Sequence, residues 1–285
     1  MRYAFIIVLA LIDAPLCLHP PVRAQDNVLD PYIGRDLWKQ RLSKNEQLVF
    51  AHLVGDVPKG DMTEPVPWHV WKTAGGERYV VLLGESLMTI PGGSSACVQL
   101  FDSTNRRTNS WSFRAGWRAE LYDASMEYSK ELGSDLIVLR TAPVINGRNI
   151  AKEFFALKDD RLRFIRLEND KGKLVQNEYI FPNYEIGIIP NANTVEQWTA
   201  LLQSKEKADV LSALVFLGGK HIDELLPGPR ESTYVNLYRE LAASARIHEL
   251  IEGLSKSENA WIREAALLAL NGPRKTQNPP RWRGR

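Results

Sequence analysis

The hydrophobic period of the chain changes near residue 190, and this change constrains the fold more than any other feature of the sequence. Between about residues 68 and 181, short apolar runs are separated by turn residues such as Gly75-Gly76 and Asp170-Lys171-Gly172. This layout is typical of antiparallel strands. From Thr194 onward, apolar residues recur at helical spacing instead. The sequence therefore predicts an α+β protein, in which an antiparallel β-sandwich or meander precedes a short α-helical domain.

The β-rich part is predicted to begin with a short helix within residues 35–50, followed by a strand at Val49–Val54 and a loop at 55–67. Residues Asp135–Leu139 are apolar without alternation, which indicates a central strand buried on both faces. Ten further strands are expected at 68–73, 78–83, 86–90, 96–102, 109–114, 118–124, 135–140, 150–157, 161–167 and 174–180.

Helices are expected at 194–203, 206–217, 231–243, 246–254 and 258–270. Thr194 followed by Gln197 is a capping-box pattern that opens the first helix. Two segments that end at Leu217 and Leu270 resemble each other, and the second contains the run WIREAALLAL. This run is similar to the inner helix of a HEAT repeat. The resemblance to HEAT repeats covers roughly residues 194–272. The resemblance implies a domain that mediates protein contacts; the alternative is an ordinary helical bundle.

The N-terminus has the layout of a secretory signal peptide. Arg2 is followed by the apolar run Tyr3–Leu11, and Val22-Arg23-Ala24 fits a cleavage site. The apolar run is shorter than the ~20 residues of a membrane span. We therefore expect an exported protein of bacterial type, periplasmic or extracellular. Its expected parts are a signal peptide at 1–24, a β-rich domain with an N-terminal helix at 25–190, a HEAT-like helical domain at 191–271 and a disordered basic tail at 272–285.

Loss of Cys17 with the signal leaves Cys97 alone, so no internal disulfide is expected. Cys97 stands between Ala96 and Val98 in a strand-like run, which predicts a buried, unpaired thiol. The tail contains Trp282 between two arginines and no acidic residue. It is expected to be solvated, with weak contact to anionic surfaces as the alternative; export argues against nucleic acid as a partner.

No residue pattern indicates catalysis. Gly84-Glu85-Ser86-Leu87-Met88 approaches the nucleophile elbow but has Met88 in place of the required second glycine. No H-E-x-x-H, Walker or dinucleotide-binding motif is present. His52 and His69 flank a loop with Asp56, Asp61 and Glu64, but without metal-ligand spacing, and His221 and His248 are expected on helix surfaces. We assign no catalytic, cofactor-binding or metal-binding residue.

The tryptophans of the β-rich part admit two interpretations. Aromatic platforms bind sugars, but Trp on strands is more often part of the core. We favour the core for Trp68, Trp71, Trp111 and Trp117.

The leading hypothesis is a non-enzymatic interaction or scaffold protein of the cell envelope, which contacts another envelope protein through its helices. The alternatives are a glycan- or lipid-binding β domain and an unfamiliar hydrolase. The boundary near Pro190 further predicts that a fragment of about residues 26–190 folds without the helices.

Overall fold

The structure is a computed structural model, and the chain folds as a mixed α+β protein. It has two antiparallel four-stranded sheets and five α-helices within the residues that are described. In that part of the chain, no helix has the length and apolarity to cross a membrane. The described residues are 27–40, 42–54, 66–85, 94–115, 119–143, 151–175, 188, 190, 192–218, 240–241 and 243–271.

Several expectations fall outside the described residues. They are the signal peptide at 1–24, the strand at 86–90, most of the strand at 174–180 and of the helix at 231–243, and the basic tail at 272–285.

The N-terminal segment forms two 3₁₀ turns, Asp30–Tyr32 and Leu37–Lys39, and then helix α1 at Lys44–Val54. The prediction of a strand at Val49–Val54 is therefore wrong, because these residues belong to α1. Ser43 and Glu46 form a reciprocal capping box, in which the Ser43 amide donates to Glu46 Oε2 over 2.7 Å and the Glu46 amide donates to Ser43 Oγ over 3.3 Å. This cap starts a helix that continues through the apolar run, with Phe50 buried and Leu48 exposed.

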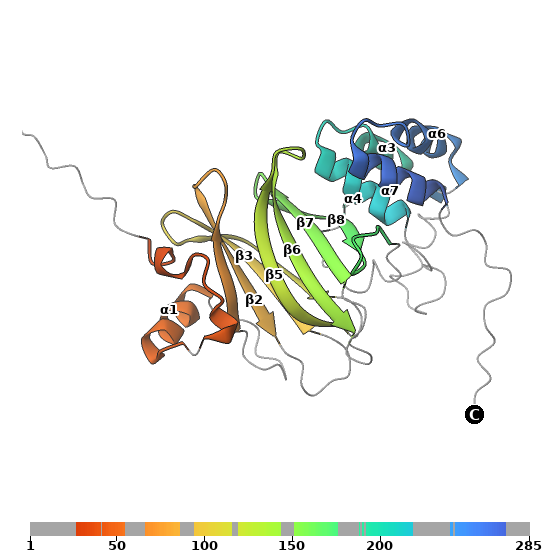
Figure 1. Ribbon diagram of the computed structural model, residues 1–285. Helices are drawn as coiled ribbons and strands as arrows, with labels where there is room; N and C mark the ends of the chain where they lie inside the picture. The colour runs from red at the N-terminus through yellow and green to blue at the C-terminus, as the bar shows by residue number, and fades with distance from the viewer. Residues whose placement is uncertain are drawn as a thin grey trace, which may run out of the picture.

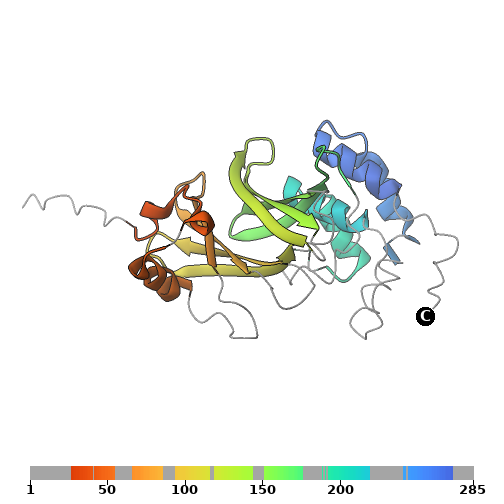
Figure 2. The same ribbon diagram turned by 60° about the horizontal axis from the view of Figure 1, so that its bottom comes forward.

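The eight strands form two meanders, in which each strand pairs with its sequence neighbour in antiparallel register. The first sheet has the order β1-β2-β3-β4, with β1 at Val66–Lys72, β2 at Arg78–Glu85, β3 at Ser94–Asp102 and β4 at Arg107–Ala115. The second sheet has the order β5-β6-β7-β8, with β5 at Ala119–Ser129, β6 at Ser134–Pro143, β7 at Ala151–Lys158 and β8 at Arg161–Glu168. Figure 2 shows the strands of the two sheets running at an angle to one another.

The described residues form three apolar cores, one after another across the molecule, because alternate residues of a strand face opposite sides of its sheet. Val81 and Leu83 of β2 pack against the N-terminal segment, whereas Val80 and Leu82 face the second sheet. The second sheet in turn packs its other face against the helices. The order of layers is N-terminal segment, first sheet, second sheet and helices, as Figure 1 shows.

Strand β6 confirms the prediction that Asp135–Leu139 is buried on both faces. Leu136 and Val138 belong to the core shared with the helices, while Ile137 and Leu139 belong to the core between the sheets. The strand has β5 and β7 as neighbours, so its backbone is paired on both sides.

The described helices of the C-terminal part are α3 (Val195–Leu202), α4 (Lys207–Leu217), α6 (Ala245–Leu254) and α7 (Ala260–Leu270). The N-cap at Thr194 is confirmed, because Thr194 Oγ1 accepts from the Gln197 amide over 3.3 Å. The return bond of a capping box is shifted by one residue, since Gln197 Oε1 accepts from the Asn193 amide over 2.7 Å. Helix α3 packs on α4 and α6, α7 packs on α4 and α6, and α4 also packs on β8.

Ion pairs connect helix α4 and the residue before it to strands β7 and β8 of the second sheet. Arg163 Nε on β8 lies 3.2 Å from Asp209 Oδ1 on α4, and Lys158 Nζ on β7 lies 2.5 Å from Glu206 Oε2 just before α4. Lys207 Nζ donates to the Glu131 carbonyl oxygen over 2.6 Å. The helices and the second sheet are therefore joined by polar contacts as well as by a common core.

Candidate functional site

The nucleophile-elbow candidate begins at Gly84, whose role in the structure is steric. A Cβ atom built on Gly84 would lie 2.2 Å from Nε1 of Trp68, far inside contact distance. Ser86 and Met88 lie outside the described residues. The glycine is thus explained by the approach of the Trp68 indole to the β2 backbone.

The histidines are dispersed. His52 is exposed on α1, and His248 is exposed on α6 with its Nε2 3.2 Å from Glu252 Oε1. His221 and the acidic loop residues Asp56, Asp61 and Glu64 lie outside the described residues. Among the residues that are described, no group of three or more His, Cys, Asp or Glu side chains is arranged to hold a metal ion.

His69 has the most unusual environment of the described histidines. It is 5% exposed, its ring stacks on Trp71 at 5.1 Å, and its Nδ1 lies 3.6 Å from Asp36 Oδ1. Its Nε2 is buried without a hydrogen-bond partner. Burial lowers the pKa of His69, and the carboxylates of Asp36 and Asp123 oppose this shift. Because desolvation dominates, the contact with Asp36 joins a neutral imidazole to a carboxylate rather than forming an ion pair.

The tryptophans of the first sheet are used in packing. Trp111 is buried, as expected for a core residue, and Trp68 and Trp71 are half-buried. Trp68 stacks on Trp38 at 4.9 Å, and the Lys39 ammonium lies 4.9 Å from the centre of the Trp38 ring. A sugar platform needs an open ring face, whereas these rings stack on neighbours. Trp117 lies outside the described residues.

Cys97 is a free thiol, but it is half-buried, so the expectation of full burial is wrong. Its Sγ lies 3.5 Å from the Ser110 hydroxyl across the β3–β4 pair. The side chain points to the face of β3 that also carries Phe101, and it lies at the margin of the core there. Its position in a strand-like apolar run gave the strand correctly but not the depth of burial.

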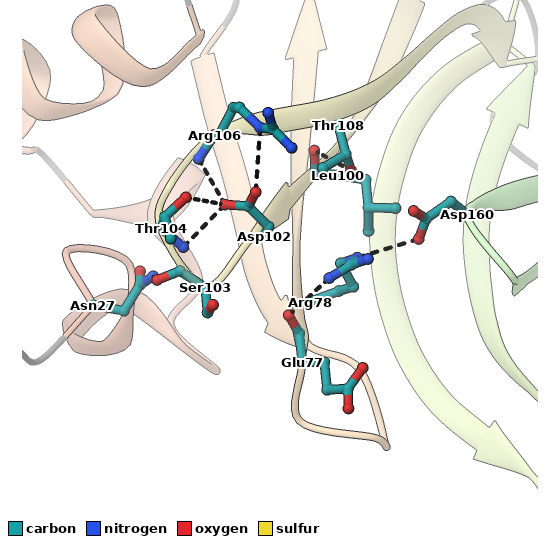
Figure 3. A network of polar contacts seen from close by, with 10 residues as sticks. All are labelled: Asn27, Glu77, Arg78, Leu100, Asp102, Ser103, Thr104, Arg106, Thr108 and Asp160. Atoms are coloured by element: carbon teal, nitrogen blue, oxygen red, sulfur yellow. Dashed lines mark hydrogen bonds and ion pairs between the residues drawn. The ribbon is translucent and has the colours of Figure 1, made fainter. Parts of the chain in front are cut away.

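A polar network joins the β3–β4 turn to its surroundings, and Figure 3 shows that its contacts at the turn converge on the carboxylate of Asp102. Asp102 Oδ1 accepts from the Thr104 amide, the Thr104 hydroxyl and the Arg106 amide at 2.9, 2.7 and 3.0 Å. These bonds, led by the Thr104 hydroxyl, lower the pKa of Asp102. Asn27 Nδ2 donates to the Ser103 carbonyl oxygen over 3.0 Å. We assign this network to turn structure, because its carboxylate is fully engaged.

A groove of about 640 Å³ lies between α3 and α6 on the outer side of the helices. Its apolar part is formed by Leu202, Leu250 and Leu254, and its polar part by Gln203, Arg246, Glu249, Glu252, Gly253 and Lys256. On α6, positions 246, 249, 250 and 253 fall on one stripe because they follow helical spacing, while Ile247 and Ile251 face the core. This groove is the candidate functional site.

The groove was not identified from the sequence. In the segments that resemble HEAT repeats, Ala213, Ala265 and Ala266 are 0%, 4% and 0% exposed, and they belong to the core where α4 and α7 meet. These small residues serve close packing inside the protein. The signal that was available is the stripe on α6, where charged residues and a glycine surround Leu250.

Comparison of the chain with family models, with curated proteins and with solved structures finds no match in any of the three.

Proposed function

We propose that this chain is an exported, non-enzymatic interaction protein of the cell envelope, which binds another envelope protein in the groove between α3 and α6. The observation that carries the proposal is the composition of the groove, in which Leu202, Leu250 and Leu254 are flanked by charged side chains of both signs. An apolar centre with a polar rim is the usual anatomy of a protein–protein interface.

Two finer features of the fold belong to the same proposal. The first is that the two sheets form a β-sandwich, which is supported by the single apolar core to which both contribute. The second is that the helices form a HEAT-like pair of repeats. In support, α3–α4 and α6–α7 are hairpin-like pairs that stack with α3 on α6 and α4 on α7, as successive repeats do in solenoids.

The cellular location of the protein and the role of its basic tail are proposed from the sequence. Residues 1–24 direct export to the periplasm or the exterior of a bacterial-type cell. The basic segment 272–285 is proposed to be solvated, with weak contact to anionic surfaces as the alternative and no nucleic acid as a partner. The glycan-binding alternative has less support, because Trp38, Trp68 and Trp71 stack on neighbouring groups.

Site-specific photocrosslinking in the native envelope tests the proposal. A photoreactive residue replaces Gln203, which lines the groove, and in a matched variant it replaces Ala200, which is exposed on α3 outside the groove. We expect one envelope protein to be captured from position 203 and not from position 200. Leu250→Ser should remove the adduct while the circular dichroism of the purified chain is unchanged. Equal adducts from both positions, or none from position 203, would contradict the proposal.

A further inference from the structure

Gly253 lies in α6 and lines the groove, and nothing within the described part of the chain requires a glycine there. A Cβ atom built on Gly253 meets no atom within 4 Å. The residue is also absent from the described glycines with positive φ, which are Gly34, Gly76, Gly133 and Gly172. Glycine is among the poorest helix formers. The bare backbone at this point leaves room for a group that approaches α6 from outside.

The charges along α6 are ordered. Arg246 lies near the start of the helix and Lys256 follows its end, while Glu249 and Glu252 lie between them. Glu252 also has the imidazole of His248 at 3.2 Å, on the exposed side of the helix. Along α6, the charges that line the groove are therefore acidic in the middle and basic at both ends, and Arg246 also interacts with Glu196 of α3. The complementary partner is basic in the middle and acidic towards its ends.

We propose that the occupant of the groove is an amphipathic α-helix of the partner protein, which crosses α6 at Gly253. Its apolar side chains pack against the partly exposed Leu250 and Leu254, beneath which Leu202 is buried, and its central basic residues face Glu249 and Glu252. A bare glycine backbone lets a second helix come closer than a side chain would allow, because the distance between helix axes depends on the residues at the contact. This inference rests on the proposed function, since it names the kind of partner that the same groove takes.

Two designed helical peptides serve as probes. Both have the same composition and the same leucine stripe; the first has lysines at its centre and glutamates at its ends, and the second has the reverse order. Each is titrated into the full chain and followed by fluorescence anisotropy. We expect the first peptide to bind at least about tenfold more tightly than the second. Replacing both Glu249 and Glu252 with lysine should reverse this preference.

The substitution Gly253→Ala should have opposite effects on the stability of the chain and on its affinity for the first peptide. The added methyl group improves helix propensity and meets no atom of the chain, so Tm should rise by about 2 °C. The same methyl group should weaken binding of the first peptide by about tenfold, because it holds the partner backbone away. The control is Ala200→Gly, a glycine–alanine exchange at an exposed position of α3 outside the groove. It should lower Tm and leave peptide affinity unchanged.

The outcomes distinguish this inference from the function on which it rests. If neither peptide binds, or both bind equally, while crosslinks from position 203 persist, the partner is a protein but not a helix of this kind. If Gly253→Ala leaves affinity unchanged, the crossing at Gly253 is overturned. If crosslinks and peptide binding are both absent, the proposed function itself fails.

Discussion

The guanidinium of Arg166, on β8, donates from Nη2 to Oε2 of Glu264, on α7, over 2.9 Å. The same group donates from Nε to Glu168 Oε1 over 2.5 Å and lies 4.9 Å from the centre of the Trp261 ring. Arg166 is 5% exposed. One buried side chain thus links the second sheet to the last described helix through two carboxylates and an indole.

Arg166→Met should lower the free energy of unfolding by about 3 kcal/mol. The reason is that the carboxylate of Glu168, whose side chain is 12% exposed, loses its arginine partner in a largely buried site. Urea unfolding followed by circular dichroism measures the change.

The matched control for this substitution is Arg106→Met. Arg106 pairs with Asp102 at 3.4 Å, but its side chain is 80% exposed. Exposed pairs contribute little, so the control should change stability by less than about 0.5 kcal/mol. Similar small losses for both variants would show that the buried network does not stabilise the junction.

Removal of the helices should unfold or loosen the β-rich part. The second sheet presents Leu136, Val138, Phe154 and Ile165 to the helical core, and a fragment that ends at residue 190 would expose them. The sequence predicts that a fragment of about residues 26–190 folds without the helices. The packing of the second sheet leads us to expect instead that this fragment does not fold on its own. The fragment should bind a hydrophobic dye and lose its near-ultraviolet circular dichroism. A sharp thermal transition equal to that of the full chain would contradict this expectation and support two independent domains.

Features that depend on neighbouring residues were predictable from the sequence. Strand positions follow from apolar runs and turn residues, and the run Asp135–Leu139 has no polar alternation because both of its faces are covered. The cap at Thr194 was predictable because its partner, Gln197, lies three residues further on.

Features that depend on distant contacts were not predictable. The apolar run at 49–54 suits a strand or a helix equally, and the contact of Phe50 with Tyr32 at 4.8 Å joins residues that are far apart in the chain. The Ser43–Glu46 box, by contrast, is a local signal for the helix that the sequence analysis overlooked. Arg166 and Glu264 are 98 residues apart in the chain, so nothing local reveals their pairing. The groove likewise requires α3 and α6 to lie side by side.

Gly84→Ala should lower the free energy of unfolding by about 1–3 kcal/mol. The new Cβ would lie 2.2 Å from Trp68 Nε1, and Trp68 cannot retreat without disturbing its stack on Trp38. Gly75→Ala is the control, because a Cβ atom there meets nothing within 4 Å and its φ is not positive. Urea unfolding followed by tryptophan fluorescence measures both variants. A loss as small for Gly84→Ala as for Gly75→Ala would exclude the steric role of this glycine.

His69 should make the protein less stable in mild acid. Burial lowers the pKa of His69 below its ordinary value of 6.5, against the opposing carboxylates of Asp36 and Asp123 and with the help of Lys39. As the pH falls below about 6.5, the unfolded chain therefore binds a proton that the folded chain does not bind. The free energy of unfolding then decreases with falling pH, by up to about 1.4 kcal/mol per pH unit, until the folded imidazole is protonated as well.

His69→Gln should remove this dependence, because the amide side chain does not titrate. Its unfolding free energy, measured in urea between pH 7.5 and 4.5, should fall less steeply than that of the unmodified chain. His52→Gln is the matched control, since His52 is exposed on α1, and its curve should run parallel to that of the unmodified chain.

The direction of the pH effect follows from the charged form of His69. Protonation of His69 places a cation in a site that is 5% exposed, and desolvation of that cation outweighs its attraction to Asp36. If the attraction prevailed instead, the pKa would be raised, and acidification through the same range would stabilise the protein. Parallel curves for His69→Gln and the unmodified chain would show that the buried imidazole is not coupled to folding.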